Sequence, residues 1–129
     1  MGLDMFLFRG KNDTTNLDEM EEVKYWRKAN QIHGYIIEKT GADPKFNCND
    51  DPIIITRDFA SGMLNDFQKA LQNKELAPSI VPTTEGFFFG STLYDDDYFV
   101  DLQDTCELLE ELIPDMNWEE EHLVYTCWW

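Results

Sequence analysis

The sequence predicts a single α+β domain, spanning residues 1–129, in which a small, mostly antiparallel sheet packs against about three helices. Three observations point to this class. Apolar and aromatic residues alternate at both ends of the chain, in residues 3–9 and 119–129. Between these ends, apolar residues recur at helical spacing, and a chain of 129 residues suits one hydrophobic core. We expect the first and last strands to pair.

The first strand is expected at residues 3–9, LDMFLFR, where apolar residues occupy both faces. A polar loop, GKNDTTN, follows it. The next segment, Asp18–Thr40, is predicted to form one helix, because acids cluster at its start and apolar residues then recur every three or four positions. Gly41 provides a natural end to this helix.

Ile53–Ile55 is a short β-branched run that suggests an edge strand. Thr56 can cap a second helix, Arg57–Lys74, whose apolar residues keep the helical spacing. The connection over residues 77–86 contains two prolines and is expected to be extended. Gly86–Phe89, GFFF, is predicted to form the third strand of the sheet.

The third helix is predicted over Asp97–Ile113 and is expected to end at Pro114. The aspartates of YDDDYF are expected to start it, since one can cap the helix and its neighbours oppose the helix dipole. A cation site fits less well, because consecutive aspartates point in different directions. The preceding GFFFGST has neither the spacing nor the lysine of a phosphate-binding loop.

The acidic residues are unevenly distributed along the chain, which has a net charge of −16. The segment Leu76–Trp129 contains thirteen acids and no lysine or arginine. Nucleic acids and anionic membranes would be repelled by such a segment, whereas a basic protein surface would be attracted. The alternative is that these acids form a solvated face that keeps the protein soluble.

The cysteines and the N-terminus indicate the compartment. Three cysteines without repeated spacing do not suggest a disulfide framework, and Cys106 falls on an apolar helical stripe where a thiol acts as a small hydrophobe. The start of the chain has no basic leader, and no apolar run approaches the roughly 20 residues that span a bilayer. We therefore expect a cytoplasmic protein without membrane contact.

Two candidate sites emerge. The first is a partner-binding acidic surface on the third helix, with Glu119–Glu121 beside it. Its residues are Asp95, Asp96, Asp97, Asp101, Asp104, Glu107, Glu110 and Glu111. The second is a small-ligand pocket shared by the first helix and the turn before the third. Its residues would be Trp26, Asn30, His33, Phe88, Ser91, Thr92 and Tyr94.

Structural roles remain open for the same pocket residues. Asn30 lies in an apolar row and needs a partner if it is buried, such as a backbone group of the GFFFGST turn. His33 can equally be a satisfied core residue. Neither histidine has metal-ligand spacing to another residue, so the sequence indicates no catalytic residue, cofactor or metal.

Three motifs, MGLDMFLFR, EEVKYWRKANQIH and GFFFGSTLYDDDYFVDL, resemble in order and spacing a family of small phage and prophage proteins. The third motif differs from the family pattern at Leu93 and in its run of three aspartates, where relatives tend to have glutamate and a mixed run. The resemblance implies a phage or mobile-element origin and an accessory role, without an established activity. Relatives are sometimes labelled phosphoglycerate kinase, but such a kinase is a much longer, two-domain enzyme.

Together, the acidic segment and the resemblance predict a non-enzymatic phage accessory protein that binds and inhibits a host protein. A basic, nucleic-acid-binding defence protein is the expected target. The alternatives are a protein that sequesters a nucleotide or other metabolite, and a structural component of the virion. Trp128 and Trp129, if exposed, would favour a homodimer.

Overall fold

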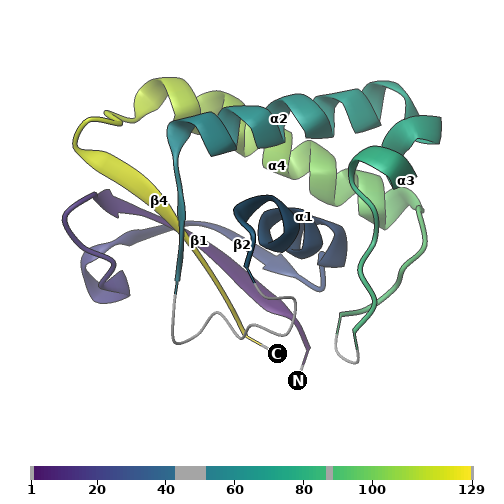
Figure 1. Ribbon diagram of the computed structural model, residues 1–129, viewed down its shortest axis with the longest axis horizontal. Helices are drawn as coiled ribbons and strands as arrows, with labels where there is room; N and C mark the ends of the chain where they lie inside the picture. Colours follow the sequence, from purple (N-terminus) through teal and green to yellow (C-terminus); the bar gives the residue numbers. More distant parts are fainter. Residues whose placement is uncertain (1, 43–51, 87–88, 129) are drawn as a thin grey trace.

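The structure is a computed structural model that describes residues 2–42, 52–86 and 89–128. It has an α+β fold, with helices packed on one face of a four-stranded antiparallel sheet (Figure 1). The sheet order is β2-β1-β4-β3. The strands are β1 (Asp4–Lys11), β2 (Glu21–Arg27), β3 (Ile53–Ile55) and β4 (Glu121–Trp128). The helices are α1 (Asn30–Thr40), α2 (Arg57–Gln72), α3 (Ala77–Ile80) and α4 (Asp96–Asp115), with 3-10 turns η1 (Leu17–Glu19) and η2 (Lys74–Leu76).

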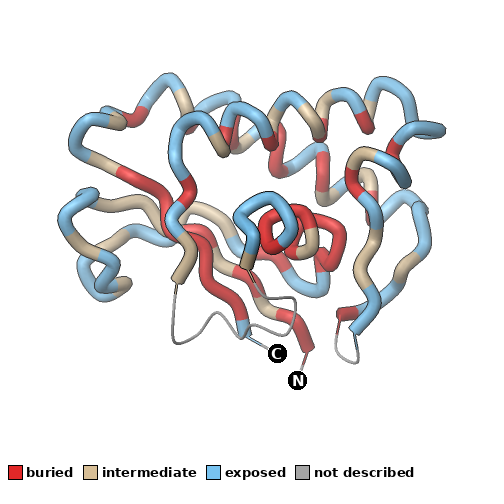
Figure 2. The backbone as a smooth tube through the Cα atoms, in the orientation of Figure 1, coloured by how far each residue is buried: buried red, intermediate tan, exposed pale blue. Residues whose placement is uncertain are grey.

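The predicted pairing of the terminal strands is confirmed. β1 and β4 lie antiparallel at the centre of the sheet, in register from Asp4 opposite Trp128 to Lys11 opposite Glu121. Met5 and Leu7 of β1 are buried toward the helices, as is Tyr125 of β4. Figure 2 shows this buried layer continuing through α1, whereas the outer surfaces of α2 and α4 are exposed.

The prediction of one helix over Asp18–Thr40 is wrong. Residues Glu21–Arg27 form β2, which pairs with β1, and only Asn30–Thr40 is helical. Val23 and Trp26 have a spacing that fits a helix, but the short segment also suits a strand, and hydrogen bonding to β1 decides between them. The chain turns at Lys28, which adopts a left-handed conformation (φ 55°) and donates its backbone N–H to the Leu3 carbonyl at 2.6 Å.

The second half of the chain follows the predictions more closely. β3 is an edge strand, and the Thr56 side chain caps α2 by accepting from the Phe59 N–H at 3.2 Å. The connection after α2 is not wholly extended, since η2 and α3 occupy it and Pro78 sits in the first turn of α3, where a proline costs no hydrogen bond. Pro114 lies within the last turn of α4 instead of ending it.

The two edge positions of the sheet are filled by β2 and β3. Of the segment GFFF, Gly86 and Phe89 lie in irregular chain, and the two phenylalanines between them fall outside the described residues. The cysteine spacing gave no sign that Cys127 is disulfide-bonded, whereas Cys106 is free and buried as its position on α4 predicted. Within the described ranges, every helix is too short or too polar to cross a membrane.

Candidate functional site

The side chain of Asn30 joins the start of α1 to the turn that precedes α4. Its Nδ2 donates to the carbonyls of Phe89 at 3.1 Å and Ser91 at 2.7 Å, and its Oδ1 accepts from the Thr84 N–H at 2.9 Å. The side chain is 1% exposed. The predicted structural hydrogen bond from Asn30 to this turn is therefore confirmed, and it positions the chain that leads into α4.

Trp26 and His33 are also engaged inside the protein. The Trp26 indole N–H donates to the hydroxyl of Thr105 at 2.8 Å, which ties β2 to α4. His33 Nδ1 lies 2.7 Å from the Tyr125 hydroxyl, and the His33 ring meets Phe89 edge-on. Burial lowers the pKa of His33 to about 4, so the ring is neutral near pH 7.

Three turn residues of the predicted ligand pocket, Ser91, Thr92 and Tyr94, make hydrogen bonds within the turn or with Thr83 and are partly or fully exposed to solvent. The Ser91 hydroxyl accepts from the Leu93 N–H at 3.1 Å, and the Thr92 carbonyl accepts from the Thr83 hydroxyl at 3.1 Å. The Tyr94 hydroxyl accepts from the Thr83 N–H at 3.0 Å. Phe88 lies outside the described residues. The polar atoms of this set are thus occupied mainly in fixing the turn.

Eight acids lie on α4 or at its N-cap between Asp95 and Glu111. We call this set the α4 acidic face: Asp95, Asp96, Asp97, Asp101, Asp104, Glu107, Glu110 and Glu111. Seven of these residues are exposed and Asp101 is half-buried. Asp95 caps the helix, as the aspartate run predicted, by accepting from the Tyr98 N–H at 3.1 Å. Among the described residues, none of the eight takes part in an ion pair.

Beyond the acidic face, Arg9 of β1 forms ion pairs with Asp115 and Glu121. Arg9 forms two hydrogen bonds with Glu121, at 2.9 and 3.0 Å, and one with Asp115 at 2.8 Å. These contacts raise the pKa of Arg9 and lower that of Glu121. Glu121, which the sequence placed beside the acidic surface, therefore belongs to a structural ion pair.

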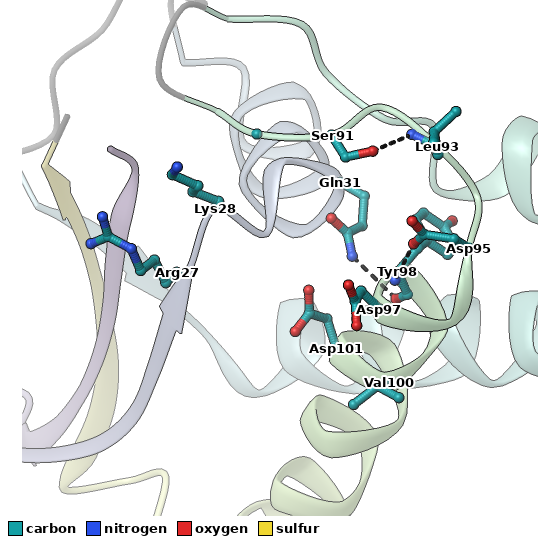
Figure 3. Close-up of a pocket in the computed structure, with 11 residues that line it drawn as sticks. Arg27, Lys28, Gln31, Ser91, Leu93, Asp95, Asp97, Tyr98, Val100 and Asp101 are labelled. Carbon is teal, nitrogen blue, oxygen red and sulfur yellow. Dashed lines mark hydrogen bonds between the residues drawn. The ribbon is translucent and has the colours of Figure 1, made fainter. Parts of the chain in front are cut away.

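A pocket of about 300 Å³ adjoins the N-terminal end of the acidic face, between α4 and the corner where β2 meets α1 (Figure 3). Its lining residues are Arg27, Lys28, Gln31, Gly90, Ser91, Leu93, Asp95, Asp97, Tyr98, Val100 and Asp101. Burial raises the pKa of Asp101, and the charges of Asp104 and Asp97 act in the same direction. A hydrogen bond from Gln31 and the charge of Lys24 oppose that rise.

The sequence reasoning placed Asp95, Asp97 and Asp101 on the acidic surface and Ser91 in the ligand pocket, and the structure brings all four to this one cavity. It missed Gln31, because a glutamine next to a predicted inward stripe looks like an ordinary surface residue. It also missed Leu93 and Val100, which are 68% and 53% exposed. The available signals were an outward apolar position on α4 at Val100 and an apolar residue in the turn before that helix at Leu93.

Within the described part of the chain, no group of three or more His, Cys, Asp or Glu side chains is placed to hold a metal ion. Comparison with known proteins adds no relative: no protein-family model matches the chain, and no curated protein or solved structure shows a significant match.

Proposed function

We propose that this chain is a non-enzymatic phage accessory protein that binds and inhibits a host protein through the α4 acidic face. The target class is a basic protein that binds nucleic acid, such as a defence protein. The observation that supports this proposal is the absence of ion pairs among the eight acids of the face, within the described residues. The resemblance of the three sequence motifs to phage proteins supports the origin.

Apart from the Asp95 cap and the hydrogen bonds that Glu110 accepts from Gln68 and Glu107 from Gln103, the acidic face contributes little to the stability of its own fold. Asp97 and Asp101, and Glu107 and Glu111, stand four residues apart on α4, where like charges destabilise a helix by about 0.2–0.5 kcal/mol per pair. Only the first acids of the helix gain from its dipole. A partner with lysines and arginines would relieve this repulsion, so a binding role explains a charge pattern that folding does not require.

The same charge pattern favours a protein partner over nucleic acid. Phosphate groups would be repelled by the face, whereas a basic groove would be attracted over several ångströms and would meet the protein faster. Occupying such a groove would exclude the nucleic acid that normally binds there. Inhibition then follows from competition and needs no catalytic residue.

Affinity capture from a host lysate at moderate salt tests the proposal against the alternative of a solvated face. The face variant carries Asp104→Asn, Glu107→Gln, Glu110→Gln and Glu111→Gln. The matched control carries Asp13→Asn, Glu19→Gln, Glu38→Gln and Glu75→Gln, which are exposed acids elsewhere, so both variants have the same net charge. We expect the wild type and the control to retain one basic protein that the face variant loses.

Two results of the capture would contradict the proposal. One is that no basic protein is enriched by the wild type. The other is that the face variant and the charge-matched control capture equal amounts, which would mean that net charge alone drives the association.

The proposal includes the host cytoplasm as the site of action and a homodimer as a candidate assembly. Disulfides are rare in reducing compartments, whereas Cys127 is disulfide-bonded in the structure. Counting the free thiols of the protein isolated from host cells therefore tests the cytoplasmic location. Trp128 is 60% exposed on β4 and is the candidate contact for a dimer. Light scattering on the wild type and on Trp128→Ser measures whether such a dimer forms.

A further inference from the structure

We infer that the pocket between α4 and the β2–α1 corner binds a lysine or arginine side chain presented by the partner protein. The inference rests on the proposed function and adds the chemistry of the group that anchors the partner. It is carried by three features of the pocket: two carboxylates on one wall, a buried amide at its base and apolar residues at its rim.

The carboxylates of Asp97 and Asp101 face the same space. They stand one helical turn apart on α4, and in Figure 3 both lie below the amide of Gln31. Neither forms an ion pair with a described residue, although Asp101 is half-buried and its charged form is disfavoured by that burial. The hydrogen bond from Gln31 and the charge of Lys24 offset this only in part, and a cation placed between the two carboxylates would add the remaining positive charge.

Gln31 forms the buried polar base of the pocket. Its side chain is 3% exposed, and its Nε2 donates to the Tyr98 carbonyl at 3.2 Å, which fixes the orientation of the amide. With Nε2 held in this way, Oε1 is directed toward the open space of the pocket (Figure 3). No described residue donates a hydrogen bond to this oxygen. An ammonium or guanidinium N–H is the matching donor.

The rim of the pocket suits an alkyl chain. Leu93 and Val100 are among the most exposed apolar residues of the described chain, at 68% and 53%, and both line the pocket. Lysine and arginine side chains carry an apolar stem behind a charged head, so the stem would cover these residues while the head reaches the carboxylates. A small inorganic cation would leave both apolar side chains in water.

The charged groups of Arg27 and Lys28, the two basic residues that line the pocket, do not occupy the space between the carboxylates. Figure 3 shows the head groups of Arg27 and Lys28 directed away from Asp97 and Asp101. Arg27 binds Asp4 at 2.8 Å. The stem of Lys28 lies against Gly90, where an added Cβ would come within 3.0 Å of the Lys28 Cβ. These residues therefore contribute mainly their stems to the wall.

Nuclear magnetic resonance titration of the intact ¹⁵N-labelled protein tests the inference with defined probes. The probes are N-acetyl-lysine amide and N-acetyl-arginine amide, and the uncharged control probe is N-acetyl-norleucine amide. We expect the charged probes to shift the side-chain amide of Gln31 and the backbone amides of Leu93, Val100 and Asp101. Norleucine amide is expected to leave the Gln31 side chain unshifted.

Matched variants separate the pocket from the general field of the helix. Asp97→Asn with Asp101→Asn removes the pocket carboxylates, and Glu107→Gln with Glu111→Gln removes the same charge about three turns further along α4. Loss of the shifts in the first variant and their retention in the second is expected, with melting temperatures confirming that both are folded. Equal shifts in both variants, or equal shifts from norleucine amide, would overturn the inference.

The titration and the affinity capture together distinguish a wrong pocket inference from a wrong proposed function. If the acidic face captures a basic partner but the Asp97/Asp101 variant retains it as well as the wild type does, the function stands and the pocket inference is wrong. If the probes bind locally but no partner is captured, the pocket stands and the proposed function is wrong.

Discussion

Replacing Asn30 by alanine should destabilise the protein strongly, because its side chain makes three hydrogen bonds that join α1 to the turn before α4. The change removes the donor to the Phe89 and Ser91 carbonyls and the acceptor for the Thr84 N–H, at 3.1, 2.7 and 2.9 Å. Each hydrogen bond contributes about 1 kcal/mol, and leaving its buried partner unpaired costs about 1–3 kcal/mol. We therefore expect Asn30→Ala to lower the free energy of unfolding by about 3 kcal/mol.

A second variant separates the donor role from loss of volume. In Asn30→Asp the shape is kept, but an oxygen replaces Nδ2 and faces the carbonyls of Phe89 and Ser91. The loss of stability should be at least as large as in the alanine variant. Asn65, which is exposed on α2, provides the control, since Asn65→Ala should stay within about 0.5 kcal/mol of the wild type.

Urea denaturation followed by tryptophan fluorescence and circular dichroism measures these differences. Hydrogen exchange adds a local readout, because the Thr84 N–H should lose protection in Asn30→Ala before the amides of β1 and β4 do. A loss of less than about 1 kcal/mol for Asn30→Ala would refute the reasoning, since it would be smaller than the usual contribution of one hydrogen bond, and this change removes one buried and two part-buried hydrogen bonds.

Three further predictions follow from charge and burial. Burial lowers the pKa of folded His33 to about 4, whereas His33 in the unfolded chain is protonated near pH 6.5. The free energy of unfolding should therefore fall by about 1 kcal/mol as the pH is lowered from about 7 to about 5.5. His33→Gln should flatten this pH dependence of stability, and an unchanged dependence would contradict neutral burial. Salt should raise the melting temperature by screening repulsion among the α4 acids, and the gain should be smaller in the face variant than in its charge-matched control; equal gains would contradict this source of strain. Alkylation in denaturant without reductant should modify one thiol per chain, because one disulfide involves Cys127 and Cys106 is free; modification of all three cysteines would contradict the disulfide and agree with a reducing compartment.

Much of the fold could be predicted because its signals are local and redundant. The terminal strands alternate over many residues, Asp95 stands in a run that only a helix start accommodates well, and Asn30 is a polar residue in an apolar row. Each of these patterns has few structural solutions. The pairing of β1 with β4, a helix cap from one of the three aspartates and a hydrogen bond from Asn30 to the turn followed from them, and the structure identifies Asp95 as the capping residue.

The unpredicted features depend on contacts between distant residues. Glu21–Arg27 is a strand because β1 provides hydrogen-bonding partners, which a local pattern does not reveal. Lys28 takes a left-handed conformation (φ 55°) that usually attracts glycine or asparagine, so the corner before α1 had no sequence signal. Because that corner brings Gln31 to face α4, the pocket could not be assembled from the sequence.

The most direct test of the acidic face is the affinity of the captured partner for three proteins: the wild type, the face variant and the control of equal net charge. Binding through the face predicts that the face variant loses at least about tenfold in affinity, equivalent to about 1.4 kcal/mol, while the control stays close to the wild type. The difference should shrink as salt is raised. Equal affinities for the face variant and the control at low salt would contradict the claim that α4 binds the partner.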